Sequence, residues 1–200
     1  SEIANKVTFM QTLCMCTGVP RKVEDISVQY SELTAEDMIE SLATIPLEGK
    51  FEEHYAYSER MYSAGGYLAA MAAGGEYGHL AEAYNQVMQE RLFDPVGMTS
   101  TTLSIDKAVA SGNYATPYYS SITDFEAIPP DVEGVFTPIA PTGAVWSNAD
   151  DLGKLLIMLL NDGVTVDGRR VVSAENLAYL WEPRTVIDTT IKYGLGWNVE

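Results

Sequence analysis

The sequence predicts a mainly α chain with a few short strands. Several segments have apolar residues at helical spacing behind a helix-capping residue, and turn-forming clusters separate them. Strand-like runs are short, and only one pair is joined by a tight-turn signal. Hydrophobic residues make up 46% of the chain and charged residues 20%, which is ordinary for a chain that buries a core. We therefore expect a single helical-rich domain over residues 1–200.

The first expected helix begins after Thr34, an N-cap residue with an acid, Asp37, at the third helical position. Apolar residues then follow at helical spacing to about Thr44. Over residues 61–73 small side chains dominate, including a Gly-Gly pair. This composition predicts a buried helix that its neighbours approach closely.

Residues 80–92 carry one apolar stripe, which predicts an amphipathic helix. Asp94-Pro95 is expected to end it, because proline disfavours the helix interior. Residues 111–141 are rich in Pro, Tyr, Ser and Asp and lack sustained periodicity. They predict an ordered but irregular excursion.

Helical periodicity returns after Asn148, a second N-cap residue, and Asn161-Asp162-Gly163 stops that helix. Asp167-Gly168 predicts a tight turn between two short strands. Ser173 then caps a last short helix that runs through Leu180.

Four segments in the same order resemble the serine β-lactamase-like family, which includes class C β-lactamases, penicillin-binding DD-peptidases and related esterases. Residues 91–103, RLFDPVGMTSTTL, resemble the family's F-x-P-L-G-M-x-x-T. Residues 13–20 (LCMCTGVP) resemble L-T-H-T-S-G-L-P, and residues 141–156 (PTGAVWSNADDLGKLL) resemble P-A-G-G-L-x-S-T-A-x-D-L-x-x-F. Residues 193–197 (YGLGW) resemble the strand entry that follows.

The resemblance implies that two parts of the active site lie outside this chain. The family nucleophile is the Ser of a Ser-x-x-Lys motif placed before the segment that residues 13–20 resemble, and a Lys-Thr-Gly or His-x-Gly motif follows the last segment. We therefore expect the helical portion of the β-lactamase/DD-peptidase-like fold, an interior fragment of a longer α/β plus α serine hydrolase. That hydrolase is expected to cleave an ester, amide or β-lactam through an acyl-enzyme, and the chain by itself is expected to be inactive. The alternative is a non-catalytic helical binding or structural domain of a degenerate homologue.

Ser104 and Lys107 spell Ser-x-x-Lys, but we interpret this match as chance. The motif needs its Ser at the start of a buried helix, with the Lys one turn on to take the hydroxyl proton. Here an acid stands between them and the surroundings are expected to form a polar loop.

The resemblance assigns catalytic chemistry in this chain to Tyr57, in Tyr57-Ser58-Glu59, where the family has Tyr-Ser-Asn. A phenol has an ordinary pKa of about 10, so it acts as general base and acid only where adjacent cations stabilise the phenolate. The other reading is that Tyr57 only packs at a helix start. Glu59 is the expected substrate-binding residue, but an ionised carboxylate cannot donate a hydrogen bond as Asn does. This departure favours simple esters or substrates with a cationic group, or else marks a non-catalytic homologue.

Aromatic residues in and beside the irregular excursion either line an acyl pocket or only hold that segment down. They are Tyr114, Tyr118, Tyr119, Phe125, Phe136 and Trp146.

Other features limit partners and cofactors. A formal charge of −16 disfavours nucleic acid, and no apolar run approaches the roughly 20 residues of a membrane span. His54 and His79 stand alone, so neither a metal nor another cofactor is expected. Cys14 and Cys16 are poorly spaced for a disulfide on a helix or strand. The expected partners are a small acyl substrate, the α/β domain of the same protein, and a second copy of the fragment. The compartment stays open, with a bacterial periplasmic or secreted location implied by the resemblance alone.

Overall fold

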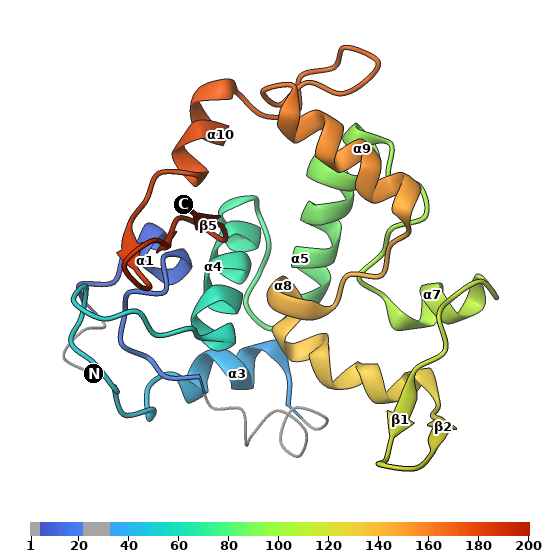
Figure 1. Cartoon of the computed structure of the whole chain (residues 1–200), viewed down its shortest axis with the longest axis horizontal. Helices are drawn as coiled ribbons and strands as arrows, with labels where there is room; N and C mark the ends of the chain where they lie inside the picture. Colours follow the sequence, from blue (N-terminus) through green and yellow to red (C-terminus); the bar gives the residue numbers. More distant parts are fainter. Residues whose placement is uncertain (1–4, 22–32) are drawn as a thin grey trace.

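The computed structural model describes residues 5–21 and 33–200, arranged as short helices around the central pair α4 and α5 (Figure 1). The helices are α1 (Phe9–Leu13), α3 (Ala35–Ser41), α4 (Glu59–Ala72), α5 (Leu80–Met88), α6 (Asp94–Val96), α7 (Ile105–Ala110), α8 (Ala140–Gly143), α9 (Ala149–Leu160) and α10 (Ala174–Leu180). A π-helical turn, η3 (Gln89–Phe93), joins α5 to α6, and a 3-10 helix, η4 (Pro130–Ile139), precedes α8.

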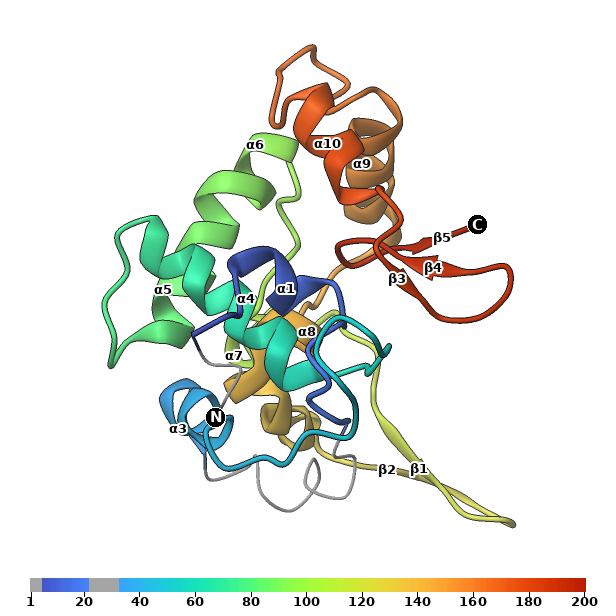
Figure 2. The same ribbon diagram turned by 90° about the vertical axis from the view of Figure 1, so that its left-hand side faces the viewer.

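Two small antiparallel sheets complete the architecture. The hairpin of β1 (Tyr118–Ser120) and β2 (Phe125–Ala127) has only exposed residues and projects from the body in both views (Figures 1 and 2). The second sheet has the order β3 (Thr185–Val186), β4 (Lys192–Tyr193), β5 (Asn198–Val199). This sheet lies beside α1, close to the start of α4.

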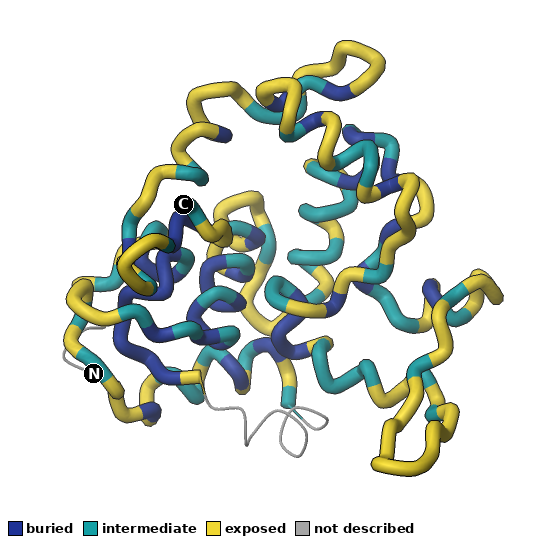
Figure 3. The backbone as a smooth tube through the Cα atoms, in the orientation of Figure 1, coloured by how far each residue is buried: buried dark blue, intermediate teal, exposed yellow. Residues whose placement is uncertain are grey.

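The buried residues form separate small cores rather than one continuous core (Figure 3). The largest lies between α6, α8 and α9 and includes Phe93, Met98 and Met158. A second, around the fully buried Met38 and Tyr67, joins α3 to α4. Small clusters of this kind stabilise less than one large core with the same number of apolar residues, because fewer side chains are fully removed from water.

The prediction of a mainly α chain is wrong. Helix accounts for 44% of the structure and strand for 9%, so less than half of it is helical. The physical reason lies in segments such as residues 112–129 and 183–197, where Gly, Pro and polar residues interrupt any helical stripe. The capped helices α3, α9 and α10 nevertheless begin after the predicted residues Thr34, Asn148 and Ser173.

Asp94-Pro95 does not end the helical segment, contrary to expectation. The chain continues through the π-helical turn into α6 and ends at Gly97, whose φ of 79° lies in the left-handed region. Proline is tolerated here because it stands in the first turn of α6, where a missing N–H costs least.

Two further local predictions need correction. Residues 105–110, expected as loop, form α7. Cys14 and Cys16 are joined by a disulfide, with Cα atoms 5.3 Å apart, although their spacing suits neither helix nor strand. Met15 between them has a φ of 53°, so the chain makes a tight left-handed turn that brings both side chains together.

None of the helices that the structure describes is both long and apolar enough to cross a bilayer.

Candidate active site

Tyr57 lies at the entry to α4, where the chain changes from an extended segment to a helix. Ser58 is the N-cap, and its hydroxyl accepts a hydrogen bond from the backbone N–H of Met61 at 3.4 Å. Ser58 is 1% exposed, so the turn that presents Tyr57 is fixed in the interior. The Tyr57 ring itself is half-buried.

The segment with the disulfide turn holds this entry in place. The N–H of Ala56 donates to the carbonyl of Met15 at 2.9 Å, and the N–H of Ser58 contacts the Met15 sulfur at 3.2 Å. On the other side of the turn, the Thr185 hydroxyl donates to the carbonyl of Cys14 at 2.7 Å. Thr185 pairs with Tyr193 in the sheet, so two of the four resembling segments, residues 13–20 and 193–197, are neighbours of the Tyr57-Ser58-Glu59 motif in space.

Three more tyrosines lie near Tyr57. The rings of Tyr55 and Tyr193 have centroids 5.7 Å apart. Burial raises the pKa of Tyr55, Tyr62 and Tyr193, and proximity to the Tyr57 phenol raises each pKa further. These three phenols therefore stay protonated at neutral pH and are neutral neighbours of Tyr57.

One cation lies directly against Tyr57. The guanidinium carbon of Arg21 lies 5.2 Å from the centroid of the Tyr57 ring, within range of a cation–π interaction. Arg21 Nε also forms an ion pair with Glu59 Oε1 at 3.0 Å. The Glu59 side chain is 13% exposed and the Arg21 side chain 54% exposed, so the carboxylate is covered and the cation faces solvent.

The structure thus brings the two predicted site residues, Tyr57 and Glu59, together at the first turn of α4. Sequence reasoning missed Arg21, Tyr62 and Tyr193. Arg21 directly follows the resembling segment 13–20, and that adjacency was the available signal. Nothing local in the sequence connects Tyr193 with a residue more than a hundred positions earlier.

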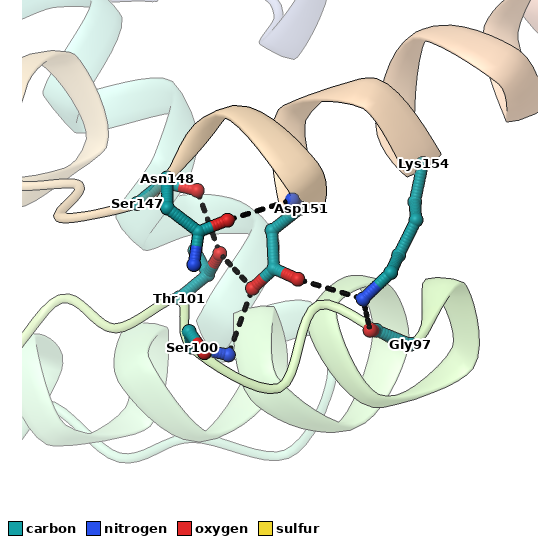
Figure 4. Close-up of polar contacts among 7 residues, drawn as sticks. All are labelled: Gly97, Ser100, Thr101, Ser147, Asn148, Asp151 and Lys154. Atoms are coloured by element: carbon teal, nitrogen blue, oxygen red, sulfur yellow. Dashed lines mark hydrogen bonds and ion pairs between the residues drawn. The ribbon is translucent and has the colours of Figure 1, made fainter.

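The other two resembling segments meet at a buried carboxylate on α9 (Figure 4). Asp151 Oδ2 accepts hydrogen bonds from the backbone N–H of Ser100 at 2.8 Å and the hydroxyl of Thr101 at 2.9 Å. Asp151 Oδ1 pairs with Lys154 Nζ at 2.8 Å, and that amine also donates to the carbonyl of Gly97 at 2.6 Å.

The charge of Asp151 is kept despite its burial. Desolvation acts to raise the pKa of its carboxyl, but the hydrogen bonds from Lys154, Ser100 and Thr101 outweigh it and hold the pKa below its ordinary value. This network joins the loop after α6 to the first turn of α9, and we assign it a structural role.

Ser104 does not meet the requirements of a nucleophile. Its hydroxyl caps α7 by accepting the backbone N–H of Lys107 at 3.3 Å. Among the described residues no hydrogen bond joins the Lys107 amine to this hydroxyl. The interpretation of Ser-x-x-Lys as chance therefore fits the geometry, although the motif stands on a helix and not in the expected loop.

A cavity of about 860 Å³ lies beside α7, away from the Tyr57 cluster. Tyr114 and Trp146 line it, with rings edge to face at 6.4 Å. Phe136 packs in the core, and the other aromatic candidates, Tyr118, Tyr119 and Phe125, are exposed on the hairpin. The six aromatics therefore do not form one acyl pocket.

Within residues 5–21 and 33–200, no group of three or more His, Cys, Asp and Glu side chains lies close enough to hold a metal ion.

The chain belongs to the Beta-lactamase family, whose model matches residues 2–200. It is similar to the unguisins hydrolase ungD' of Aspergillus campestris, with 28% identity over 98% of this chain and 36% of the relative. It is also similar to protein Rv1367c of Mycobacterium tuberculosis, with 32% identity over 68% of this chain and 32% of the relative. The chain thus spans about a third of the length of these relatives.

Solved structures share the fold at low identity. The octameric penicillin-binding protein homologue from Pyrococcus abyssi has a TM-score of 0.77 and 18% identity, over 96% of this chain and 43% of that one. The D-amino acid amidase from Ochrobactrum anthropi SV3 has a TM-score of 0.70 and 17% identity, over 99% of this chain and 55% of that one. The fold is therefore that of the β-lactamase family and not a mainly α class.

Proposed function

We propose that the protein to which this chain belongs is a serine hydrolase that cleaves an ester, amide or β-lactam through an acyl-enzyme. The observation that supports this most directly is the position of Tyr57. It stands at the entry to α4, directly before the N-cap, with two of the resembling segments beside it and the Arg21 cation on its ring.

In this proposal Tyr57 is the general base and acid. A serine hydroxyl attacks the acyl carbon and its proton passes to the Tyr57 phenolate, which then gives the proton to the departing oxygen or nitrogen. Water repeats the sequence on the acyl-enzyme, so the serine is regenerated with its proton. The nucleophile and its lysine are proposed to lie outside this chain, which is then inactive by itself.

The test compares hydrolysis of a chromogenic cephalosporin and of p-nitrophenyl butyrate by this chain and by the complete protein. We expect activity in the complete protein and its loss, by about a hundredfold or more, in Tyr57→Phe. Tyr77→Phe is the matched control, since Tyr77 is exposed and its hydroxyl donates a hydrogen bond to Glu40 on α3, away from Tyr57. Activity in the 200-residue chain would place the nucleophile within it and direct attention to Ser104. Inactivity of both proteins would favour a non-catalytic relative.

We also propose that the rest of the protein, expected to include an α/β domain, covers the outer face of α9. This face exposes Leu152, Leu156, Ile157 and Leu160, the last at 83%. An apolar stripe of this kind favours association when it is left in water. The 200-residue chain alone is therefore expected to form homodimers, and light scattering that shows a monomer at high concentration would contradict this.

A further inference from the structure

We propose that the cavity beside α7 is a binding site for a sugar acid, a ring that carries several hydroxyl groups and a carboxylate. The cavity has a volume of about 860 Å³ and lies between α7 and the stretch that leads into α9. Neither Tyr57 nor Glu59 lines it. The proposal is therefore independent of the hydrolase reaction and goes beyond it.

The charge of the cavity wall is the first feature that indicates an anionic ligand. Among the described residues that line the cavity, Lys107 has the only charged side chain, in a chain whose formal charge is −16. Its amine forms no hydrogen bond or ion pair within the described part of the chain. A wall without acids and with an unpaired cation favours a negatively charged ligand over a neutral or cationic one.

A second, smaller cavity indicates where the carboxylate of the ligand lies. It has a volume of about 210 Å³ and shares Gln89, Thr102 and Lys107 with the larger cavity. Glu90 lines the smaller cavity, and its negative charge would repel an anion there. We therefore expect the carboxylate in the larger cavity, next to Lys107.

The other side chains of the larger cavity match a ring with hydroxyl groups. The rings of Tyr114 and Trp146 meet edge to face, with centroids 6.4 Å apart, and aromatic rings of this kind cover the C–H face of a sugar. The hydroxyls of Thr99 and Ser100 and the amide of Asn113 also line the cavity, and none of them is hydrogen-bonded to another described residue. Hydroxyl and amide groups both donate and accept hydrogen bonds, as sugar hydroxyls do. This wall therefore favours a polyhydroxylated ring over an apolar acid.

Contacts within the chain hold the wall in place before a ligand binds. Thr102 and Trp146 exchange two backbone hydrogen bonds, of 2.9 and 2.8 Å. The Thr101 hydroxyl and the Ser100 N–H, on the same wall, both donate to the buried carboxylate of Asp151 (Figure 4). A wall that is already ordered loses less entropy on binding, so the Asp151 network supports the site as well as the fold.

The experiment measures binding to the complete protein by isothermal titration calorimetry with three probes. Glucuronate carries the ring, the hydroxyls and the carboxylate, glucose lacks the carboxylate, and cyclohexanecarboxylate lacks the hydroxyls. We expect glucuronate to bind most tightly. Lys107→Gln is expected to lower the ratio of the affinities for glucuronate and glucose by about threefold to tenfold, because this lysine is exposed and its charge is partly screened.

Two further variants separate the parts of the proposed site. Tyr114→Ala should weaken the binding of glucuronate and glucose by the same factor, because the ring contacts the part that they share. Lys50→Gln is the matched control, since Lys50 is also an exposed lysine but pairs with Glu53 at 3.4 Å, away from the cavity. Both affinities should stay unchanged in this control.

Three results would overturn the proposal, whether or not the complete protein hydrolyses an ester. The first is glucuronate that does not bind, or binds no more tightly than glucose or cyclohexanecarboxylate. The second is a ratio of affinities that Lys107→Gln leaves unchanged or that Lys50→Gln lowers as much. The third is full affinity for both sugars in Tyr114→Ala, which would place their binding elsewhere in the protein.

Discussion

The same three residue types, arginine, tyrosine and glutamate, form two groups at different places in the molecule. At the entry to α4, Arg21 lies on Tyr57 and pairs with Glu59. Beyond the end of α10, Arg184 lies 4.2 Å from the Tyr179 ring centroid and pairs with Glu182 at 2.9 Å. Their burial is opposite: the carboxylate is the covered partner in the first group, whereas the cation is covered in the second, at 17% exposure.

The difference shows that the role of an ion pair depends on which of its two partners is buried. The covered Arg184 side chain donates a hydrogen bond to the carbonyl of Tyr179 at 3.3 Å. Tyr179 lies in the last turn of α10, where a cation stabilises the end of the helix. Covered Glu59 occupies the first turn of α4, where a negative charge is favourable, and leaves its arginine in water. One arrangement secures a helix end, and the other presents a charge.

A third ion pair, Asp151–Lys154, extends this comparison to a carboxylate that is almost fully buried. Removing the charge of this carboxylate should change stability more than any other substitution in the comparison. Asp151→Asn removes the charge that two hydrogen-bond donors, the Ser100 N–H and the Thr101 hydroxyl, and the Lys154 amine satisfy. We expect the free energy of unfolding to fall by about 3 kcal/mol, measured by denaturant titration. Asp150→Asn, one residue earlier and exposed, is the control. A loss equal to that of the control would show that burial of the carboxylate does not matter here.

The difference in stability between the unmodified protein and Asp151→Asn should disappear in acid. The pKa of Asp151 is lowered in the folded protein from the ordinary 3.8, so the unfolded chain binds the proton more tightly. Its contribution to stability is therefore complete above pH 3.8 and is lost as pH falls through the folded-state pKa. Stability curves of the unmodified protein and Asp151→Asn should converge in that range, and a constant gap between them would contradict the assignment.

Arg184→Gln should have the next largest effect, a loss of about 1–2 kcal/mol in the free energy of unfolding, because packing on Tyr179 and a helix-end hydrogen bond are both lost. Thermal unfolding followed by circular dichroism measures it. If Arg21→Gln destabilises the protein as much as Arg184→Gln, exposure of the arginine does not distinguish the two groups and the comparison fails.

The smallest effects are expected at the acids. Glu59→Gln should cost about 1 kcal/mol, because it removes a covered carboxylate from the first turn of α4. Glu182→Gln should change stability by less than about 0.5 kcal/mol, since its carboxylate is exposed. Denaturant titration of the two variants measures the two losses of stability. If Glu182→Gln cost more than Glu59→Gln, the exposure of the carboxylate would not determine how much each ion pair stabilises the protein.

Helix starts were predictable wherever a polar cap preceded an apolar stripe, as at Thr34, Asn148 and Ser173. The resemblance also identified the segments that meet around Tyr57. Capping and periodicity depend on residues that are close in the chain, so they can be recognised from the sequence alone.

Features that depend on distant contacts were not predictable. The disulfide follows from the left-handed backbone at Met15, which residue spacing does not reveal. The pairing of Arg21 with Glu59 joins residues 38 positions apart, and it gives the Glu59 carboxylate a partner within the chain. Both the disulfide and the ion pair depend on the three-dimensional fold, which the local sequence does not specify.

The adjacent glycines of α4 have a consequence for how this family member can change over time. A methyl group at position 65 would lie 2.5 Å from the Thr12 hydroxyl oxygen, and one at position 66 would lie 2.4 Å from the Cβ of Pro141. The absence of a side chain at each glycine therefore allows a different segment to lie close to α4. At Gly65 this segment leads into the disulfide turn, and at Gly66 it is α8, which leads into α9. A larger residue at position 65 would therefore displace residues at the C-terminal end of α1, whereas one at position 66 would displace Pro141 of α8 and Tyr84 of α5, so the two positions are constrained by different parts of the molecule.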